Sequence, residues 1–101
     1  MKIVAVTACP TGVAHTNMAA KALLKCGKDL GHEIKVERQG ALGIQGRLTA
    51  SDIAEADVVI FAVDQKVREE QRFSGKICHK VPVAAPIKNG KKVIEDALSL
   101  L

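Results

Sequence analysis

Runs of apolar residues alternate with mixed segments along the chain, and this pattern predicts strands and helices in turn. Residues 3–7 and 58–63 are continuous runs rich in β-branched residues, as in strands buried on both faces of a parallel sheet. Ile34 and Val36 alternate with charged residues, which predicts a strand at a sheet edge. A weaker run at 77–81 predicts a short fourth strand.

The segments between these strands carry helix and turn signals. Over residues 16–30 the apolar side chains recur on one helical face, and Gly31 then provides a C-terminal stop. The sequence Thr-Ala-Ser-Asp at 49–52 resembles the cap of a short helix. The almost wholly polar stretch 65–71 predicts a short exposed helix or turn, and a terminal helix is expected to follow Asn89-Gly90.

The alternation of strand and helix predicts an α/β fold, with a four-stranded parallel sheet between helices on both faces in an open, Rossmann-like three-layer sandwich. Right-handed crossovers favour the strand order 2-1-3-4, in which the winding reverses between the first and third strands. Ligands bind such sheets at this switch point, beyond the carboxyl ends of the strands. The glycine-rich segment 40–46 is expected to be a loose connecting loop on that edge. We expect residues 1–101 to form a single domain.

Composition narrows the functional classes. The net charge is +4, but the lysines and arginines are scattered, and only 2% of the residues are aromatic, so we expect no nucleic-acid partner. The first apolar run is too short for a signal peptide or a membrane span, which favours a cytoplasmic location. We also expect no metal and no cofactor, because the histidines and cysteines lack ligand spacing. Cys26 and Cys78 are expected to be structural.

The segment after the first strand holds the most reactive residues of the chain. In order, it reads Cys9, Pro10, Thr11, Gly12, Val13, Ala14, His15 and Thr16. A loop that leads from a strand into a helix presents unpaired backbone amides and the positive end of the helix dipole, which together bind anions. The same field favours a thiolate at Cys9, a nucleophile suited to phosphorus. A Cys9 sulfur packed among apolar side chains would count against this prediction.

These residues carry a resemblance to a known family. The segment 9–16, followed by Met-Ala-Ala at 18–20, resembles the active-site signature of the fructose-class enzyme IIB domain of the bacterial phosphoenolpyruvate-dependent sugar phosphotransferase system. The similarity continues through the segments 36–40, 48–53, 56–60 and 72–76. It therefore spans nearly the whole chain.

The resemblance implies a phosphocysteine relay. A phosphohistidine on a partner IIA protein or domain would donate its phosphoryl group to Cys9, and residues 10–16 would bind that group. The group would then pass to a sugar, by default fructose, held by the membrane-embedded IIC component, so the domain would work at the inner face of the membrane. Asn17 departs from the aromatic residue expected in many relatives. We expect a monomer.

Two other functions use a similar loop. A low-molecular-weight cysteine phosphatase requires the pattern Cys-x5-Arg, but the arginine position is occupied by His15, and no Asp-Pro pair offers a general acid. A non-catalytic anion-binding adaptor module remains the alternative from a different class.

Four side chains near this edge have open roles. His15 either donates to a phosphate oxygen or faces solvent in the first helical turn, and Thr16 is expected to cap the helix. Asp64, after the third strand, is expected to hydrogen-bond the loop backbone. Arg72 is expected to be exposed to solvent, with phosphate or a partner's acidic surface as the other reading.

Overall fold

The computed structural model describes residues 1–9, 13–40 and 43–101. Pro10, Thr11, Gly12, Ala41 and Leu42 lie outside the described residues. The elements are, in chain order, β1 (Lys2–Ala8), α1 (Val13–Asp29), β2 (Glu33–Gly40), β3 (Gly43–Gln45), α2 (Ala50–Glu55), β4 (Val58–Val63), the 3-10 helix η1 (Glu70–Phe73), β5 (Cys78–Val81) and α3 (Ala84–Leu98).

The described strands form one mixed sheet in the order β3-β2-β1-β4-β5. The four predicted strands are parallel and in the predicted order, but β3 joins as a fifth, antiparallel to β2. The prediction of a purely parallel four-stranded sheet with β2 at its edge is therefore wrong. The predicted loop 40–46 contains this hairpin instead, because Gly43 and Gly46 adopt positive φ angles of 111° and 63° at the ends of β3.

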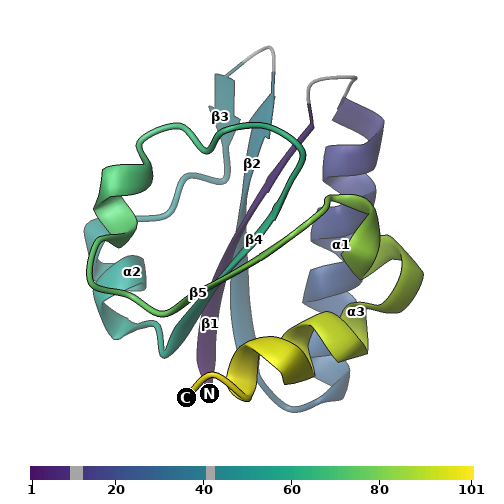
Figure 1. Ribbon diagram of the computed structural model, residues 1–101, viewed down its shortest axis with the longest axis vertical. Helices are drawn as coiled ribbons and strands as arrows, with labels where there is room; N and C mark the ends of the chain where they lie inside the picture. Colours follow the sequence, from purple (N-terminus) through teal and green to yellow (C-terminus); the bar gives the residue numbers. More distant parts are fainter. Residues whose placement is uncertain (10–12, 41–42) are drawn as a thin grey trace.

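Helices cover both faces of the sheet, as predicted. Figure 1 shows α1 and α3 on one side and α2 with η1 on the other. Because successive side chains of a strand point to opposite faces, β1 and β4 supply both cores. The core under α1 and α3 contains Ile3, Ala5, Val58, Ile60 and Ala62 from the strands.

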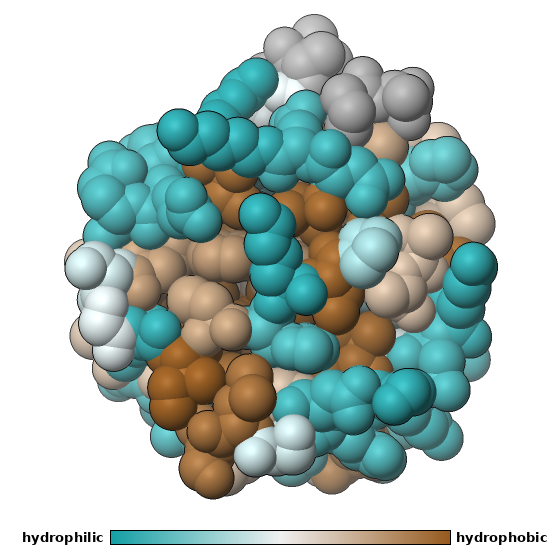
Figure 2. All heavy atoms as spheres, in the orientation of Figure 1, coloured by the Kyte–Doolittle hydropathy of each residue, from teal (hydrophilic) through white to brown (hydrophobic). Residues whose placement is uncertain are grey.

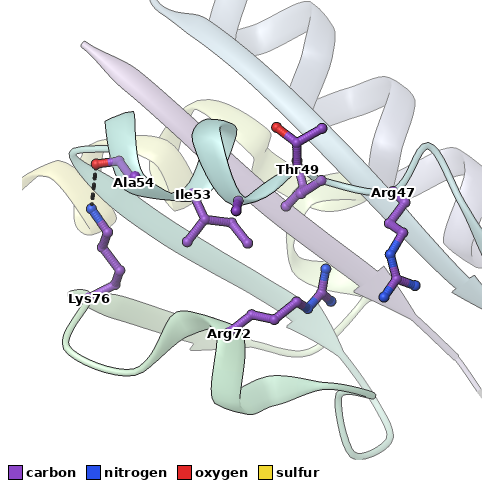
Figure 3. Close-up of a pocket in the computed structure, with 8 residues that line it drawn as sticks. Arg47, Thr49, Ile53, Ala54, Arg72 and Lys76 are labelled. Carbon is purple, nitrogen blue, oxygen red and sulfur yellow. Dashed lines mark hydrogen bonds between the residues drawn. The ribbon is translucent and has the colours of Figure 1, made fainter.

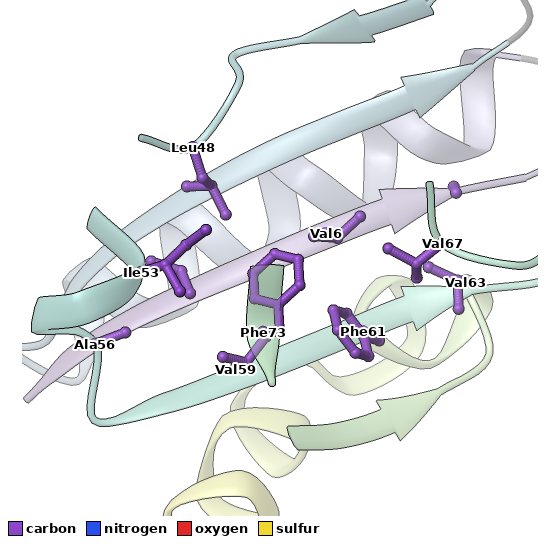
Figure 4. Close-up of a cluster of buried hydrophobic side chains, with 11 residues drawn as sticks. Val6, Leu48, Ile53, Ala56, Val59, Phe61, Val63, Val67 and Phe73 are labelled. Atoms are coloured by element: carbon purple, nitrogen blue, oxygen red, sulfur yellow. The ribbon is translucent and has the colours of Figure 1, made fainter. Parts of the chain in front are cut away.

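The opposite core lies between the sheet, α2 and η1 (Figure 4). Its strand residues are Val4, Val6, Ala8, Val59, Phe61 and Val63. Phe61 and Phe73, which are both of the chain's phenylalanines, meet edge to face with their ring centroids 5.1 Å apart. This contact fixes η1 over the middle of the sheet, and it explains why the polar stretch before η1 stays against the protein.

The helix ends follow the predicted signals at two places. α1 ends at Asp29, and Gly31 follows with a φ of 78°, which turns the His32 amide back to donate to the Gly27 carbonyl over 2.8 Å. α2 begins with a capping box, in which Thr49 and Asp52 each accept a hydrogen bond from the other's backbone amide over 3.0 Å. The predicted short helix after Thr49 is confirmed.

α3 begins earlier than predicted. Its helical backbone is interrupted at Asn89, where φ is −157° and ψ is 81°. The Asn89 side chain accepts a hydrogen bond from the Lys92 amide over 3.2 Å and so caps the second half of the helix. The predicted terminal helix corresponds to that second half. The first half, from Ala84, carried no periodic signal of its own.

Figure 2 shows hydrophilic residues around this face, with apolar residues across its middle and at its lower edge. Figure 1 draws both chain ends at that lower edge, and Met1, Leu100 and Leu101 are exposed. Within the described ranges, no helix has the length and apolar character needed to cross a membrane.

Candidate functional site

Cys9 directly follows β1 at the carboxyl end of the sheet, where the chain crosses over to α1. β1 lies between β2 and β4, so Cys9 occupies the predicted switch point. Its side chain is only 5% exposed and packs with Ala19 of α1, Val83 and the partly buried Ile87. Cys9 is therefore packed among apolar side chains on this side, which is the arrangement that counts against the predicted thiolate, while residues 10–12, which were expected to surround the sulfur, lie outside the described residues. The sulfur lies in the layer between the sheet and the helices α1 and α3.

The first turn of α1 supplies the described part of the predicted anion site. The helix begins at Val13, so Ala14, His15 and Thr16 all lie in its first turn. The first four amides of a helix have no partner within the helix, and they carry the positive end of its dipole. These amides are the groups that can meet an anion at Cys9. The predicted contributions of residues 10–12 lie outside the described residues.

The side chains of this turn divide between solvent and core. Ala14 and His15 are exposed, which places the imidazole in solvent as one of its two predicted roles requires. Thr16 is 2% exposed and lies inside the helix. The prediction that Thr16 caps the helix is wrong, because α1 begins three residues before it. Among the described residues, its hydroxyl has no hydrogen-bond partner.

Asp64 joins the loops that surround Cys9. Its amide donates to the Ala8 carbonyl over 3.0 Å, and its carboxylate accepts from the Val83 amide over 3.1 Å. The predicted hydrogen bond to a loop backbone exists, but the loop is the one between β5 and α3. Because Val83 packs against Cys9, Asp64 positions one wall of the cysteine's surroundings.

A buried polar network follows β2 on the other face of the sheet. Glu37 has no exposed surface, and Arg72 donates to its two carboxylate oxygens over 2.9 and 2.8 Å. The Leu48 amide and Gln39 donate to the same carboxylate. The Arg72 side chain is only 17% exposed, so the prediction of a solvent-exposed arginine is wrong. The amide of Arg68 and the Gln39 side-chain oxygen add a further hydrogen bond of 2.8 Å.

The pKa shifts follow from this geometry. Burial raises the pKa of Glu37, but the hydrogen bonds from Arg72, Gln39 and the Leu48 amide outweigh it and lower the pKa below the ordinary value. The hydrogen bonds to Glu37 raise the pKa of Arg72. Both groups are therefore charged at neutral pH. The pair ties β2 to η1, which contains Arg72.

A cleft of about 590 Å³ opens beside this network, between α2 and η1 (Figure 3). The positively charged side chains that line the cleft all bind other groups of the protein. Arg72 binds Glu37, and Arg47 forms an ion pair with Glu69. Lys76 donates to the carbonyls of Ala54 and Ala56 over 2.9 and 3.1 Å. The cleft lies on the face opposite the layer that holds Cys9, so we do not assign the site to it.

Sequence reasoning missed Arg38 and its link to the site. The Arg38 Nη1 atom donates to Asn17 Oδ1 of α1 over 3.1 Å. The signal that the sequence offers for this link is Asn17, which stands where an aromatic residue is expected in many relatives.

Comparison with known proteins assigns the chain to a family. Residues 4–96 match the family described as "PTS system, Lactose/Cellobiose specific IIB subunit". The chain belongs to this IIB family. The resemblance predicted from the Cys9 segment is thereby confirmed at the level of the family.

Relatives of this IIB chain include components of fructose-type systems. It is 52% identical over 98 residues to the "PTS system fructose-specific EIIABC component" of Bacillus subtilis (strain 168), covering 97% of this chain and 15% of the relative. It is 50% identical over 98 residues to the "PTS system 2-O-alpha-mannosyl-D-glycerate-specific EIIABC component" of Escherichia coli (strain K12), with the same two coverages. The IIB chain thus spans about 15% of the length of these two relatives.

A solved structure supports the fold independently. The crystal structure of a domain from the fructose-specific IIABC component of Borrelia burgdorferi is 46% identical in sequence and superimposes with a TM-score of 0.91. The match covers 96% of this IIB chain and 92% of that chain.

Proposed function

We propose that this IIB chain is a phosphoryl carrier in which Cys9 receives and passes on a phosphoryl group. The Cys9 thiolate attacks phosphorus, the P–N bond of a phosphohistidine breaks, and the imidazole leaves. In the second step a sugar hydroxyl attacks the same phosphorus, its proton passes to solvent or a base, and the S–P bond breaks to restore the thiolate. The observation that carries this proposal is the position of Cys9, between β1 and the amino end of α1 in a member of the IIB family.

The chain itself supplies electrostatic stabilisation for both steps. The transferred group spreads negative charge over three equatorial oxygens, and backbone amides aimed at them stabilise that charge. We assign this role to the amides of Ala14, His15 and Thr16, and the support for it is that α1 begins at Val13, shortly after Cys9. We propose that the amides of Thr11, Gly12 and Val13 complete the set, and that Pro10, which has no amide hydrogen, restricts the loop after Cys9.

We propose the partners and the substrate from the longer proteins to which the relatives belong. The donor is a IIA protein or domain, and the acceptor is a sugar bound by the membrane-embedded IIC component. Fructose or a related sugar is the substrate class we propose, since relatives act in a fructose-specific and a mannosylglycerate-specific system. In this proposal residues 1–101 act as one cytoplasmic domain at the inner face of the membrane.

The test is covalent labelling through the relay. The protein is incubated with radiolabelled phosphoenolpyruvate, the general phosphotransferase proteins and a matching IIA, and bound phosphoryl groups are counted per chain. We expect one group on the wild type and none on Cys9→Ser, with Cys78→Ser as the control that still accepts one. Thiol alkylation of Cys9 should also block acceptance. Phosphoryl uptake by Cys9→Ser through the relay would overturn the proposal.

A further inference from the structure

Arg38 projects from β2 toward α1, on the same face of the sheet as Cys9. Its guanidinium group donates to Asn17 Oδ1, which fixes it beside the first turns of α1. Cys9 packs against Ala19 of the same helix. Arg38 therefore lies in the layer that contains the thiol, while its neighbours Glu37 and Gln39 take part in the network on the opposite face.

The charge of Arg38 is not neutralised within the described part of the chain. Arg72 is paired with Glu37, and Arg47 is paired with Glu69. The described ion pairs do not include Arg38, whose side-chain partner Asn17 is neutral. A half-buried arginine held by an amide oxygen keeps its full positive charge for an anion.

A small hollow beside Arg38 is also lined by a buried hydroxyl that has no hydrogen-bond partner among the described residues. The hollow measures about 10 Å³, which is the space of roughly one water-sized atom. Thr16 lines it, and the Thr16 hydroxyl is buried with no hydrogen-bond partner among the described residues. Such a buried hydroxyl is costly unless something binds it. Arg38 is the only charged residue among those described at the wall of this hollow.

Two geometric arguments, one along α1 and one across the sheet, place this hollow within reach of Cys9. Thr16 lies three residues before Ala19 on α1, so the two share one helix face with their Cβ atoms about 5–6 Å apart, and Ala19 contacts Cys9. On the sheet, Arg38 is paired with Thr7, two residues before Cys9. Strand geometry then puts the Cα atoms of Arg38 and Cys9 about 8 Å apart. A phosphoryl group on the sulfur and an arginine side chain together span such a distance.

We propose that Arg38 and Thr16 bind one oxygen of the phosphoryl group carried by Cys9, and that Asn17 positions Arg38 for this contact. The inference rests on the proposed function. The ligand is a phosphate dianion, which receives a charge-assisted hydrogen bond from the guanidinium and an ordinary one from the hydroxyl. The hollow admits a single oxygen, so the rest of the group stays on the side of Cys9.

The first experiment measures binding of inorganic phosphate to the unphosphorylated protein. Amide shifts of Thr16 and Arg38 are followed by NMR while phosphate is added at constant ionic strength set with chloride. We expect Arg38→Gln to raise Kd about three- to tenfold, since it removes a charge-assisted hydrogen bond from a half-exposed site. Arg38→Lys should keep part of the affinity, because it keeps the charge. Thr16→Val, which removes the hydroxyl at nearly constant volume, should also raise Kd.

Arg47→Gln is the matched control, because it removes the same charge from the opposite face of the sheet and should leave Kd unchanged. Wild-type protein without phosphate-dependent shifts at Thr16 and Arg38, or an Arg38→Gln variant with an unchanged Kd, would overturn the inference. Phosphoryl acceptance in the relay is measured on the same samples. If Cys9 accepts the group and Arg38→Gln leaves Kd unchanged, only the Arg38 assignment fails. If wild-type Cys9 accepts none, the proposed function fails whatever the Kd values are.

Discussion

Glu37 is a carboxylate with no exposed surface that nevertheless stays ionised. Burial raises its pKa, and the hydrogen bonds from Arg72, Gln39 and the Leu48 amide together lower it below the ordinary value of 4.5. Gln39 lies on β2 itself, two residues after Glu37, whereas the Leu48 amide and Arg72 come from later segments of the chain. The single carboxylate therefore holds both the segment before α2 and the helix η1 against the same strand.

Arg72→Met should test this arrangement through the stability of the fold. The substitution leaves Glu37 buried without its cation, which costs about 3–5 kcal/mol in the free energy of unfolding. The measurement is urea denaturation at pH 7. Arg47→Met is the control, since the Arg47 side chain is 54% exposed and its ion pair with Glu69 contributes at most about 1 kcal/mol. Equal losses in the two variants would contradict the role of the buried pair.

The same variant has a defined pH dependence. In the wild type the folded pKa of Glu37 lies below 4.5, so its stabilising contribution is complete above that pH and is lost as the pH falls through the folded pKa. In Arg72→Met, burial without the arginine raises the folded pKa, so ionised Glu37 destabilises that variant above pH 4.5. The stability difference between the two proteins should narrow as the pH falls from the raised folded pKa of the variant to the lowered folded pKa of the wild type, which lie on either side of 4.5. A difference that widens in acid would contradict this account.

The residue-level errors of the sequence analysis have a common cause. Glu37 and Arg72 are 35 positions apart, and each sits in a segment whose pattern is that of an exposed surface. No local period reveals that the two side chains meet. Cys9 could be placed at the switch point from strand order, but its packing against Ala19 and Val83 depends on how α1 and α3 approach each other. That approach is a tertiary property.

At the scale of elements, the sequence predicted the strands whose burial is complete. β1 and β4 supply both cores, so nearly every residue in them is apolar and the run is unmistakable. β3 is three residues long with one apolar side chain, Ile44, which is too short to show alternation. The first half of α3 contains Pro86 in its first turn, where proline is tolerated, and the helical backbone is then interrupted at Asn89. This half is too short to show a helical period in the sequence.

The packing of α3 on α1 depends on the absence of a side chain at Gly90. A Cβ atom added there would lie 2.7 Å from Cys26 Sγ and 3.3 Å from the Ala22 carbonyl oxygen. We expect Gly90→Ala to destabilise the protein by about 1–3 kcal/mol, measured by urea denaturation. Cys26→Ala in the same chain removes the nearest atom, so the double variant should lose less than the two single variants together. Strict additivity would show that the two helices do not meet at this point.

At the scale of the whole molecule, the two edges of the sheet favour the predicted monomer. An unpaired strand edge offers a row of amides and carbonyls to another chain, and short strands and lysine side chains limit such pairing. β3 is three residues long, and β5 is four residues long with Lys80 exposed. Neither edge offers a long apolar ladder. We therefore expect the protein to sediment as a single species near 10.7 kDa under reducing conditions.

The exposed cysteine Cys78 provides a second test of the expected monomer. It is exposed on β5, whereas Cys9 is buried and Cys26 is half-buried. Although the residue is exposed, partial burial of its sulfur, with a smaller contribution from the Glu70 charge, raises the pKa of the Cys78 thiol, so a disulfide should form slowly without an added thiol oxidant. Diamide should then convert monomer to a covalent dimer, which Cys78→Ser abolishes and Cys9→Ser leaves intact. A dimer that persists in reductant, or in Cys78→Ser, would place the association surface elsewhere on the molecule.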